Sequence, residues 1–388
     1  MAFHGHLRSG KPVSPLDSIL VVGTGLIGTS VALALREHGV EVRLADLDPG
    51  AVRLASELGA GLPWSAQEGG PAFDLAVIAV PPQYVAAELL ALQERGVARH
   101  YTDVASVKAL PLAQAESLGC DVASFVAGHP LAGRERSGPA AARADLFLGR
   151  PWAYCPTPET SPAAVETLLG LIKLCGAEAV RVGAEEHDRA VAVVSHAPHV
   201  TAAAVAARLA EAPETALGLA GQGVRDVTRI AAGDPALWTG ILSGNALPVA
   251  KVLEAVAADI AAAAAALRRT AGHDVPDGEP APGGRADDLA GMPWVTALLE
   301  RGVTGTGRIP GKHGGPASVY ANVQVIVGDR PGELARLFQV AKEAGVNIED
   351  VRLEHTPGLP LGAAELSVQP QAADTLIGAL RAHGWHIP

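Results

Sequence analysis

Two histidines three residues apart, His196 and His199, lie in the segment SHAPH, within a stretch that is otherwise almost entirely alanine and valine. An imidazole can ligate a metal ion, exchange a proton near neutral pH or bind an anionic substrate. The pair has neither the HExxH spacing nor a third ligand beside it, so we predict no metal site. The alternative to substrate binding is burial with hydrogen bonds to the backbone, and it weighs more for His196 than for His199.

A glycine-rich turn, GTGLIG at 23–28, follows the apolar segment ILVV and precedes a helical segment. In that context the pattern is typical of dinucleotide binding, because the three glycines allow a tight turn, a close approach to a pyrophosphate and packing of the helix on the strand. Free N–H groups at the helix N-terminus favour an anion. A plain βα turn is the alternative. The expected cofactor contacts are Gly23, Thr24, Gly25, Leu26, Ile27, Gly28, Val80 and Pro81.

Asp46 ends the next expected strand, 23 residues beyond Gly23. An acid at this position accepts a hydrogen bond from the ribose 2′-hydroxyl and repels a 2′-phosphate. We therefore predict NAD rather than NADP as the cofactor. Asp48 competes for this role, and either acid could instead cap the following helix.

Three further segments carry polar residues that stand out from their surroundings. DVASVK (103–108) and AGHPLAGRERSG (127–138) each lie at the end of an expected strand, where a Rossmann domain binds its ligand. The segment AGQGVRDVTRIAAGDPALW (220–238) places, in or beside a helix, Arg225, Asp226, Arg229 and Trp238.

The elements that position these residues alternate in the first third of the chain. Strands are expected in SILVV (18–22), EVRLAD (41–46), DLAVIAV (74–80), HYTDVAS (100–106), SFVAG (124–128) and WAYCPT (152–157), with helical runs or loops between them. This order predicts an α/β fold with a parallel, doubly wound sheet of Rossmann type. From about residue 185 the composition is helical without strand segments, and the last part of the chain has the order βαββα of a small α+β unit.

The predicted domain organisation follows from these changes. We expect a tail at 1–15, an NAD-binding domain at 16–184, an all-helical substrate and dimerisation domain at 185–270, a Pro/Gly-rich linker with the short helix WVTALLERG at 271–318, and the α+β unit at 319–388. The alanine richness of the helical part favours close packing and a homodimer.

Composition excludes several classes. The 388 residues are 48% hydrophobic and 18% charged with a net charge of −11, which argues against disorder and against a nucleic-acid partner. Three widely spaced cysteines without a CxxC motif predict no disulfide framework. The N-terminus has no apolar signal-peptide region, and the only long apolar stretch, at 255–269, is mostly alanine. We expect a cytoplasmic protein without a membrane partner.

Five segments in order, GTGLIG, TDVASVK, GHPLAGRERSG, HDRAVAVVSHAPH and GVRDVTRIAAGDPALW, resemble the prephenate/arogenate dehydrogenase family of tyrosine biosynthesis. The segment VGDRPGELARLFQVAKEAGVNIEDV resembles an ACT domain, a regulatory module. The resemblance covers nearly the whole chain apart from the tail and the linker. It implies an NAD-dependent oxidative decarboxylation of prephenate to 4-hydroxyphenylpyruvate.

The resemblance also implies roles for single residues. His129 takes the place of the catalytic histidine, which accepts the hydrogen bond of the ring hydroxyl, and Ser106 bonds the same hydroxyl near the nicotinamide. Arg229 and His199 bind the anionic substrate, with His196 and Trp238 beside them. Arg225 is a second candidate for a carboxylate, and Gln222 departs from the glycines usual in the family, which could bear on the choice between prephenate and arogenate.

Each of these roles has a structural alternative. His129 could cap a loop, Ser106 could cap the helix that starts near Val107, and Arg229 could pair with Asp226. Arogenate dehydrogenase is the nearest alternative function, and a dehydrogenase of 4-amino-4-deoxyprephenate is a distant one. An inactive nucleotide or amino-acid sensor is the alternative from another class.

The C-terminal unit is expected to bind an amino-acid effector, with tyrosine as the predicted ligand. By resemblance to ACT domains, the contacts are Asp329, Gly332, Leu334, Asn347 and Ile348. The alternative is that this unit only dimerises.

Overall fold

The computed structural model describes residues 16–65, 71–133, 136–271, 292–310, 320–355 and 361–388. The chain divides into two compact units, one up to Ala257 and one from Ala258. The predicted tail and nearly all of the Pro/Gly-rich part of the predicted linker lie outside the described residues. The finer domain boundaries at 184, 270 and 318 stay predictions.

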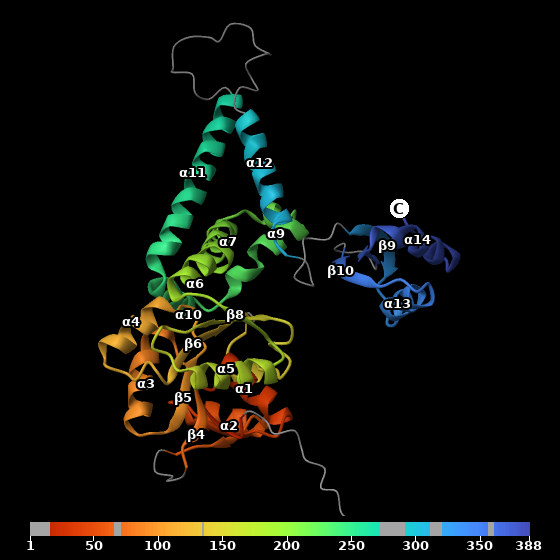
Figure 1. Ribbon diagram of the computed structural model, residues 1–388. Coiled ribbons are helices and arrows are strands. Elements are labelled where there is room, and N and C mark those ends of the chain that lie inside the picture. Colours follow the sequence, from red (N-terminus) through yellow and green to blue (C-terminus); the bar gives the residue numbers. More distant parts are fainter. Residues whose placement is uncertain (1–15, 66–70, 134–135, 272–291, 311–319, 356–360) are drawn as a thin grey trace, which may run out of the picture. The chain divides into compact units, whose positions relative to one another are not determined.

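The first unit contains an eight-stranded sheet in the order β3-β2-β1-β4-β5-β6-β7-β8. Figure 1 labels β4, β5, β6 and β8 among these strands. Its strands are β1 (Ser18–Val22), β2 (Glu41–Ala45), β3 (Leu62–Pro63), β4 (Phe73–Ile78), β5 (Ala98–Asp103), β6 (Phe125–Pro130), β7 (Pro151–Cys155) and β8 (Glu178–Arg181). The six predicted strands are all present. The amino-acid pattern does not predict β3, which is only two residues long, or β8, whose four residues are all exposed.

Helices cover both faces of this sheet because alternate side chains of each strand point to opposite faces. Ile19 and Val21 of β1 lie in one core with α1 (Leu26–Glu37), α2 (Pro49–Glu57) and α5 (Pro162–Leu174). Leu20 and Val22 lie in a second core with α3 (Val85–Glu94) and α4 (Ala109–Ser117). Two separate cores confirm the predicted doubly wound architecture.

One pairing departs from the expected parallel arrangement, since β6 and β7 are antiparallel. A parallel pair needs a crossover connection, usually a helix. The described part of the connection between them holds only the short helix η2 (Pro139–Ala141), so the chain returns beside β6 in the opposite direction. The expectation of a parallel sheet is therefore wrong at the pairing of β6 with β7.

After β8 the first unit is helical, as predicted, and no strand interrupts the described residues from 184 to 271. Its elements are α6 (Ala184–Val191), the π-helix η3 (Ala192–His196), α7 (Ala197–Leu209), α8 (Glu214–Leu217), α9 (Gln222–Thr228), η4 (Arg229–Ala232) and α10 (Pro235–Gly244). The next helix, α11 (Ala246–Thr270), begins in the first unit and continues into the second, which starts at Ala258. α6 packs against α4, and α10 packs against η1 (Pro82–Tyr84). These contacts place the helices beside the ends of β4 and β5.

The run at 184–209 is long and apolar enough to cross a membrane by length and composition, a test that core helices of soluble proteins also pass. From the sequence, a long apolar stretch is expected only at 255–269. The buried side chains of the run include His187, Asp188, His196 and His199. Asp188 accepts hydrogen bonds from the segment after β5, so the start of the run is anchored to the sheet of the first unit.

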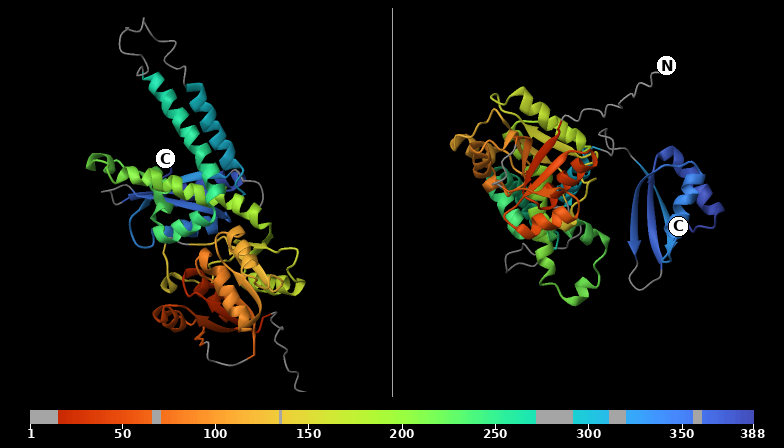
Figure 2. Two further views of the ribbon diagram at one scale, coloured as in Figure 1. Left: turned by 90° about the vertical axis from the view of Figure 1, so that its left-hand side faces the viewer. Right: turned by 90° about the horizontal axis from the view of Figure 1, so that it is seen from below.

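In the second unit, β9 (Ala321–Gly328), α13 (Glu333–Glu343), β10 (Ile348–His355), β11 (Leu361–Val368) and α14 (Ala373–Ala382) follow the predicted βαββα order. The sheet is antiparallel with the order β10-β11-β9, and α13 and α14 cover one face of it (Figure 2). The helix predicted at 294–302 is longer in the structure, where α12 spans Met292–Gly307. It continues past Gly302, and in this part the Thr304 hydroxyl donates to the Glu300 carbonyl oxygen.

Candidate active site

The predicted cofactor and catalytic residues follow four strands that lie side by side. In the sheet, β1, β4, β5 and β6 are neighbours and run parallel. The glycine turn follows β1, Val80 follows β4, Ser106 follows β5, and His129 lies near the end of β6. Since the carboxyl ends of parallel strands meet at one edge, these residues line one continuous edge, where Rossmann folds bind their ligands.

The glycine turn has the geometry that its sequence predicts. Gly23 has φ +99°, and a Cβ there would lie 2.3 Å from the Ala79 carbonyl oxygen. A Cβ on Gly28 would lie 1.9 Å from the Gly23 carbonyl oxygen, so only glycine is accommodated. Around Gly25 the space is open, with no atom within 4 Å of a Cβ position. The turn therefore presents bare backbone before the N-terminus of α1, as a pyrophosphate site requires.

The two acids after β2 make different contacts. Asp46 Oδ2 accepts hydrogen bonds from the backbone N–H of Thr24 at 2.6 Å and from its hydroxyl at 3.0 Å, which ties the end of β2 to the glycine turn. Asp48 caps α2 by accepting from the Gly50 N–H at 2.8 Å. A hollow of about 550 Å³ lies against Asp46 and is also lined by Arg53 and Trp64.

A fully buried ion pair lies under this edge of the sheet. Lys108 Nζ pairs with Asp103 Oδ2 and donates to the Gly128 carbonyl oxygen at 2.6 Å, with both side chains fully buried. Asp103 Oδ1 accepts from the Gly128 N–H at 3.1 Å. A buried charge is stable only when it is paired and hydrogen-bonded. These contacts bind the end of β5 to the residue that immediately precedes His129.

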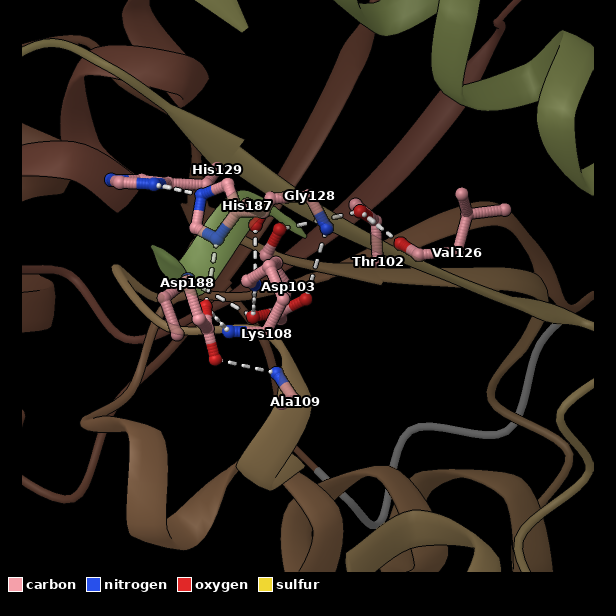
Figure 3. Close-up of polar contacts among 10 residues, drawn as sticks. Thr102, Asp103, Lys108, Ala109, Val126, Gly128, His129, His187 and Asp188 are labelled. Carbon is pink, nitrogen blue, oxygen red and sulfur yellow. Dashed lines mark hydrogen bonds and ion pairs between the residues drawn. The ribbon is translucent and has the colours of Figure 1, made fainter. Parts of the chain in front are cut away.

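A second chain of contacts reaches His129 from α6 (Figure 3). Asp188 accepts hydrogen bonds from the backbone N–H groups of Lys108 at 2.8 Å and Ala109 at 2.9 Å, at the N-terminus of α4. Asp188 Oδ1 also lies 2.8 Å from His187 Nδ1, and His187 Nε2 lies 2.8 Å from His129 Nδ1. Three side chains from two distant segments thus form one hydrogen-bonded row that ends at His129.

The surroundings of His129 favour its neutral form. Burial lowers the pKa of His129 well below its usual value, and His187, Lys108 and His196 lower it further. A neutral imidazole has one unprotonated nitrogen and can accept a proton or a hydrogen bond at pH 7. His129 is therefore suited to the role of a general base or hydrogen-bond acceptor.

His196 and His199 lie in a second group around Trp238. The rings of His199 and Trp238 stack with centroids 3.5 Å apart, and His196 meets the same indole edge-on at 6.1 Å. Asn245 Nδ2 lies 3.1 Å from His196 Nδ1 and donates to the Asp188 carbonyl oxygen at 2.7 Å. Asn245 therefore connects the group around Trp238 with Asp188 of the row that ends at His129. Among the described residues, no three His, Cys, Asp or Glu side chains are placed to hold a metal ion.

Burial also sets the charge of these two imidazoles. Burial lowers the pKa of His196 to about 4 and lowers the pKa of His199. Both rings are therefore neutral near pH 7 and contact other groups by stacking and hydrogen bonding. His196 ends the π-helix η3, a rare element that often occurs at functional sites.

The remaining predicted site residues lie nearer to solvent. Ser106 is partly buried and does not cap α4, whose N-cap is Lys108, so the capping alternative is wrong. Arg225, Arg229 and Gln222 are exposed, although η4, which begins at Arg229, packs against α7. Gln222 Nε2 donates to Asp226 Oδ1 at 2.8 Å.

The predicted effector residues fall into two places in the second unit. Asp329, Gly332 and Leu334 follow β9, whose last residue pairs with Leu361 of β11. Asn347 and Ile348 lie at the start of β10, and Ile348 pairs with Val368 at the other end of β11. At about 3.3 Å per residue, the eight residues of β11 separate the two places by roughly 23 Å. One chain does not bring them together.

Sequence reasoning missed four buried side chains of the site, namely Asp103, Lys108, His187 and Asp188. All four stand within the polar segments TDVASVK and HDRAVAVVSHAPH. The available signal was a charged or polar side chain in a segment that reads as buried, because such a group needs a partner. Asn245, which joins the two histidine groups, stands in the segment SGN and carried no comparable signal.

The fold and this edge define a nucleotide-dependent dehydrogenase of Rossmann type. Family models for the prephenate dehydrogenase nucleotide-binding domain and dimerization domain match residues 31–181 and 183–276. The probable prephenate dehydrogenase NovF of Streptomyces niveus is 42% identical over 95% of this chain and 99% of its own length. The chain belongs to the prephenate dehydrogenase family.

Other relatives cover less of the chain. The prephenate dehydrogenase of Bacillus subtilis is 33% identical over 59% of this chain and 64% of its own length. The solved prephenate dehydrogenase of Aquifex aeolicus, in complex with hydroxyphenyl propionate and NAD+, superposes with a TM-score of 0.61 at 26% identity over 74% of this chain and 98% of that one. The Synechocystis arogenate dehydrogenase gives a TM-score of 0.55 at 25% identity over 74% of this chain and 99% of that one.

Proposed function

We propose that this protein is an NAD-dependent prephenate dehydrogenase that converts prephenate to 4-hydroxyphenylpyruvate and carbon dioxide. The observation that carries the proposal is the neutral His129 at the end of β6, in hydrogen-bonded contact with His187 and on the same sheet edge as the glycine turn. Family membership and the relatives that act on prephenate support the substrate.

The residues on the sheet edge fit NAD. The open space at Gly25 admits a pyrophosphate, and Asp46 is placed to accept a hydrogen bond from a ribose hydroxyl. Val80, Pro81 and Ser106 continue this edge toward His129. When bound, NAD+ supplies the acceptor for the hydride.

His129 acts on the ring hydroxyl of the substrate. Its unprotonated nitrogen accepts the hydrogen bond of that hydroxyl and increases the electron density on the oxygen, which favours departure of hydride from the same carbon. The bond from the ring to its carboxylate breaks, carbon dioxide leaves and the ring becomes aromatic. Ser106 bonds the same hydroxyl. The product oxygen ends as a phenol, so the reaction releases no net proton when carbon dioxide is the product.

Arg229 and the group around Trp238 bind the rest of the substrate. A guanidinium suits a carboxylate because it donates two parallel hydrogen bonds. Arg229 is exposed at the start of η4, beside α7, which carries His199. His199 and His196 are neutral, so they contribute as hydrogen-bonding and stacking groups, and Arg225 and Gln222 of α9 lie one and two turns before Arg229.

The test is NADH formation with prephenate and with arogenate, each with NAD+ and with NADP+. The expected result is fast turnover with prephenate and NAD+, and a His129→Asn variant should lose about 100-fold or more in kcat while keeping its affinity for NADH. Preference for arogenate would move the protein to the activity of its Synechocystis neighbour. No turnover with any pair would contradict the proposal and favour a sensor.

We also propose the assembly and regulation of the protein. The match to a dimerization domain at 183–276 supports a homodimer formed by the helices after β8. The βαββα order supports an ACT-type regulatory domain that binds tyrosine. The relatives are biosynthetic dehydrogenases, and we place the protein in the cytoplasm.

A further inference from the structure

We propose that His187 and Asp188 are positioning residues for the reaction: together they hold His129 in the one tautomer whose unprotonated nitrogen, Nε2, faces the substrate. The inference rests on the proposed function and deepens it. This role would explain why a row of hydrogen bonds from α6 ends at His129.

The direction of the hydrogen bonds starts at Asp188. Its carboxylate accepts from two backbone N–H groups, those of Lys108 and Ala109, and these groups can only donate. Both lie at the N-terminus of α4, where the helix dipole favours a negative charge. A carboxylate held by two such donors can only accept. It follows that His187 Nδ1, 2.8 Å away, carries the proton of this contact.

The same logic passes along the row. A neutral imidazole protonated on Nδ1 has an unprotonated Nε2. His187 Nε2 therefore accepts, and the proton between the two rings, whose nitrogens are 2.8 Å apart, belongs to His129 Nδ1. His129 Nε2 is then the unprotonated nitrogen, and it points away from the row (Figure 3). A row that ends in a fixed acceptor suits a reaction in which the enzyme must accept a hydrogen bond.

The buried charges support the same task. Among the groups facing His129, Asp103 of β5 and Lys108 form an ion pair with each other, and His196 of η3 is neutral. The donors to Asp188 are two amides and an imidazole. The negative charge of Asp188 therefore attracts the positive charge that develops on the two imidazoles as the hydroxyl proton moves toward His129.

The first measurement needs no substrate. In protein labelled with 15N-histidine, the nitrogen shifts of His129, assigned from the His129→Asn variant, should show a protonated Nδ1 and an unprotonated Nε2. A protonated Nε2 would overturn the proposal. Because this measurement is independent of prephenate, it stands or fails separately from the proposed activity.

The second measurement uses Asp188→Asn and His187→Gln. Asp188 Oδ1 accepts from both the Lys108 N–H and His187 Nδ1, so an amide oxygen at this position keeps these two contacts. The negative charge and the acceptor for the Ala109 N–H are lost, so kcat should fall by about tenfold with KM and NADH affinity changed less than about threefold. In His187→Gln the amide oxygen can still accept from His129 while the bond to Asp188 is lost, so kcat should fall by about tenfold.

The control is His100→Gln, which removes an imidazole that bonds the Thr167 hydroxyl at 2.9 Å in the same unit, and it should keep wild-type kcat. If Asp188→Asn does not fold, the wild-type shifts and His187→Gln still decide the question. A folded His187→Gln or Asp188→Asn with wild-type kcat would overturn the assignment.

Discussion

The histidines of the site differ in task because their surroundings differ. His129 keeps part of its surface accessible, whereas His187 and His196 are almost fully buried. Burial keeps His196 neutral, and its Nδ1 lies beside an amide of Asn245. His199 stacks on Trp238. A cluster of similar side chains thus divides into one with an accessible surface, which we propose as the reacting group, and others that are buried.

The low pKa of His196 predicts a pH-dependent stability. Its pKa is about 4 in the folded chain, below that of an exposed histidine, so the unfolded chain binds the extra proton first. This stability is complete above about pH 6.5 and is lost as the pH falls toward 4, with a maximum loss on the order of 3 kcal/mol. Urea unfolding at pH 7.5 and 5 should show a smaller pH dependence for His196→Gln than for wild type. The exposed His383→Gln variant should behave as wild type, and an unchanged slope in His196→Gln would contradict the assignment.

Asp46 should determine the affinity and the choice of cofactor. In Asp46→Ala, loss of the ribose acceptor and of the Thr24 contact should weaken NADH binding by about tenfold or more and reduce discrimination against NADPH. Fluorescence titration of both cofactors measures this. Asp48→Ala is the matched control, because losing the α2 cap costs about 1 kcal/mol of stability without touching the cofactor. Equal effects in both variants would argue against the assignment.

At the scale of elements, the turn between β1 and α1 contains glycines with two different roles. Gly28 is needed for folding, and Gly25 is expected to be needed for cofactor binding. Gly28→Ala should destabilise the chain severely, because its Cβ would overlap the Gly23 carbonyl oxygen. Gly25→Ala has open space, so it should fold with a nearly unchanged melting temperature and still lose NADH affinity, since the methyl group occupies the pyrophosphate position. Thermal melts and titrations on both variants distinguish these outcomes. Normal NADH binding by Gly25→Ala would show that the cofactor does not approach this turn.

Elements with a local signal were predictable, and those that depend on distant contacts were not. The glycine turn, the six main strands and Asp46 follow from spacing within short segments, because backbone geometry alone dictates those residues. His187 contacts His129 and Asp188 contacts Lys108, which are 58 and 80 residues away in sequence, so the local polarity indicates a buried partner but does not identify it. The direction of β7 was predicted wrongly for the same reason, since it depends on the path of the long connection from β6.

At the scale of the whole molecule, regulation is the open prediction. Saturating tyrosine should lower kcat or raise the melting temperature, and Asn347→Ala should abolish the effect while leaving the basal activity intact. The two groups of predicted effector residues lie at opposite ends of their sheet, so a complete site needs residues from two copies of the chain. Tyrosine response should therefore disappear on dilution to monomers. If tyrosine changes neither activity nor stability, the C-terminal unit has another task.

The hydrogen bonds from Asp188 to the start of α4 have a consequence for how the enzyme is made. During translation the strands from β1 to β8 leave the ribosome before α6, which supplies Asp188 and His187. A nascent chain can therefore form its cofactor-binding sheet while His129 still lacks the partner that orients it. The chain is expected to become catalytically active only when the following helices dock. Fragments that end before α6 are therefore expected to bind the dinucleotide but to show no dehydrogenase activity.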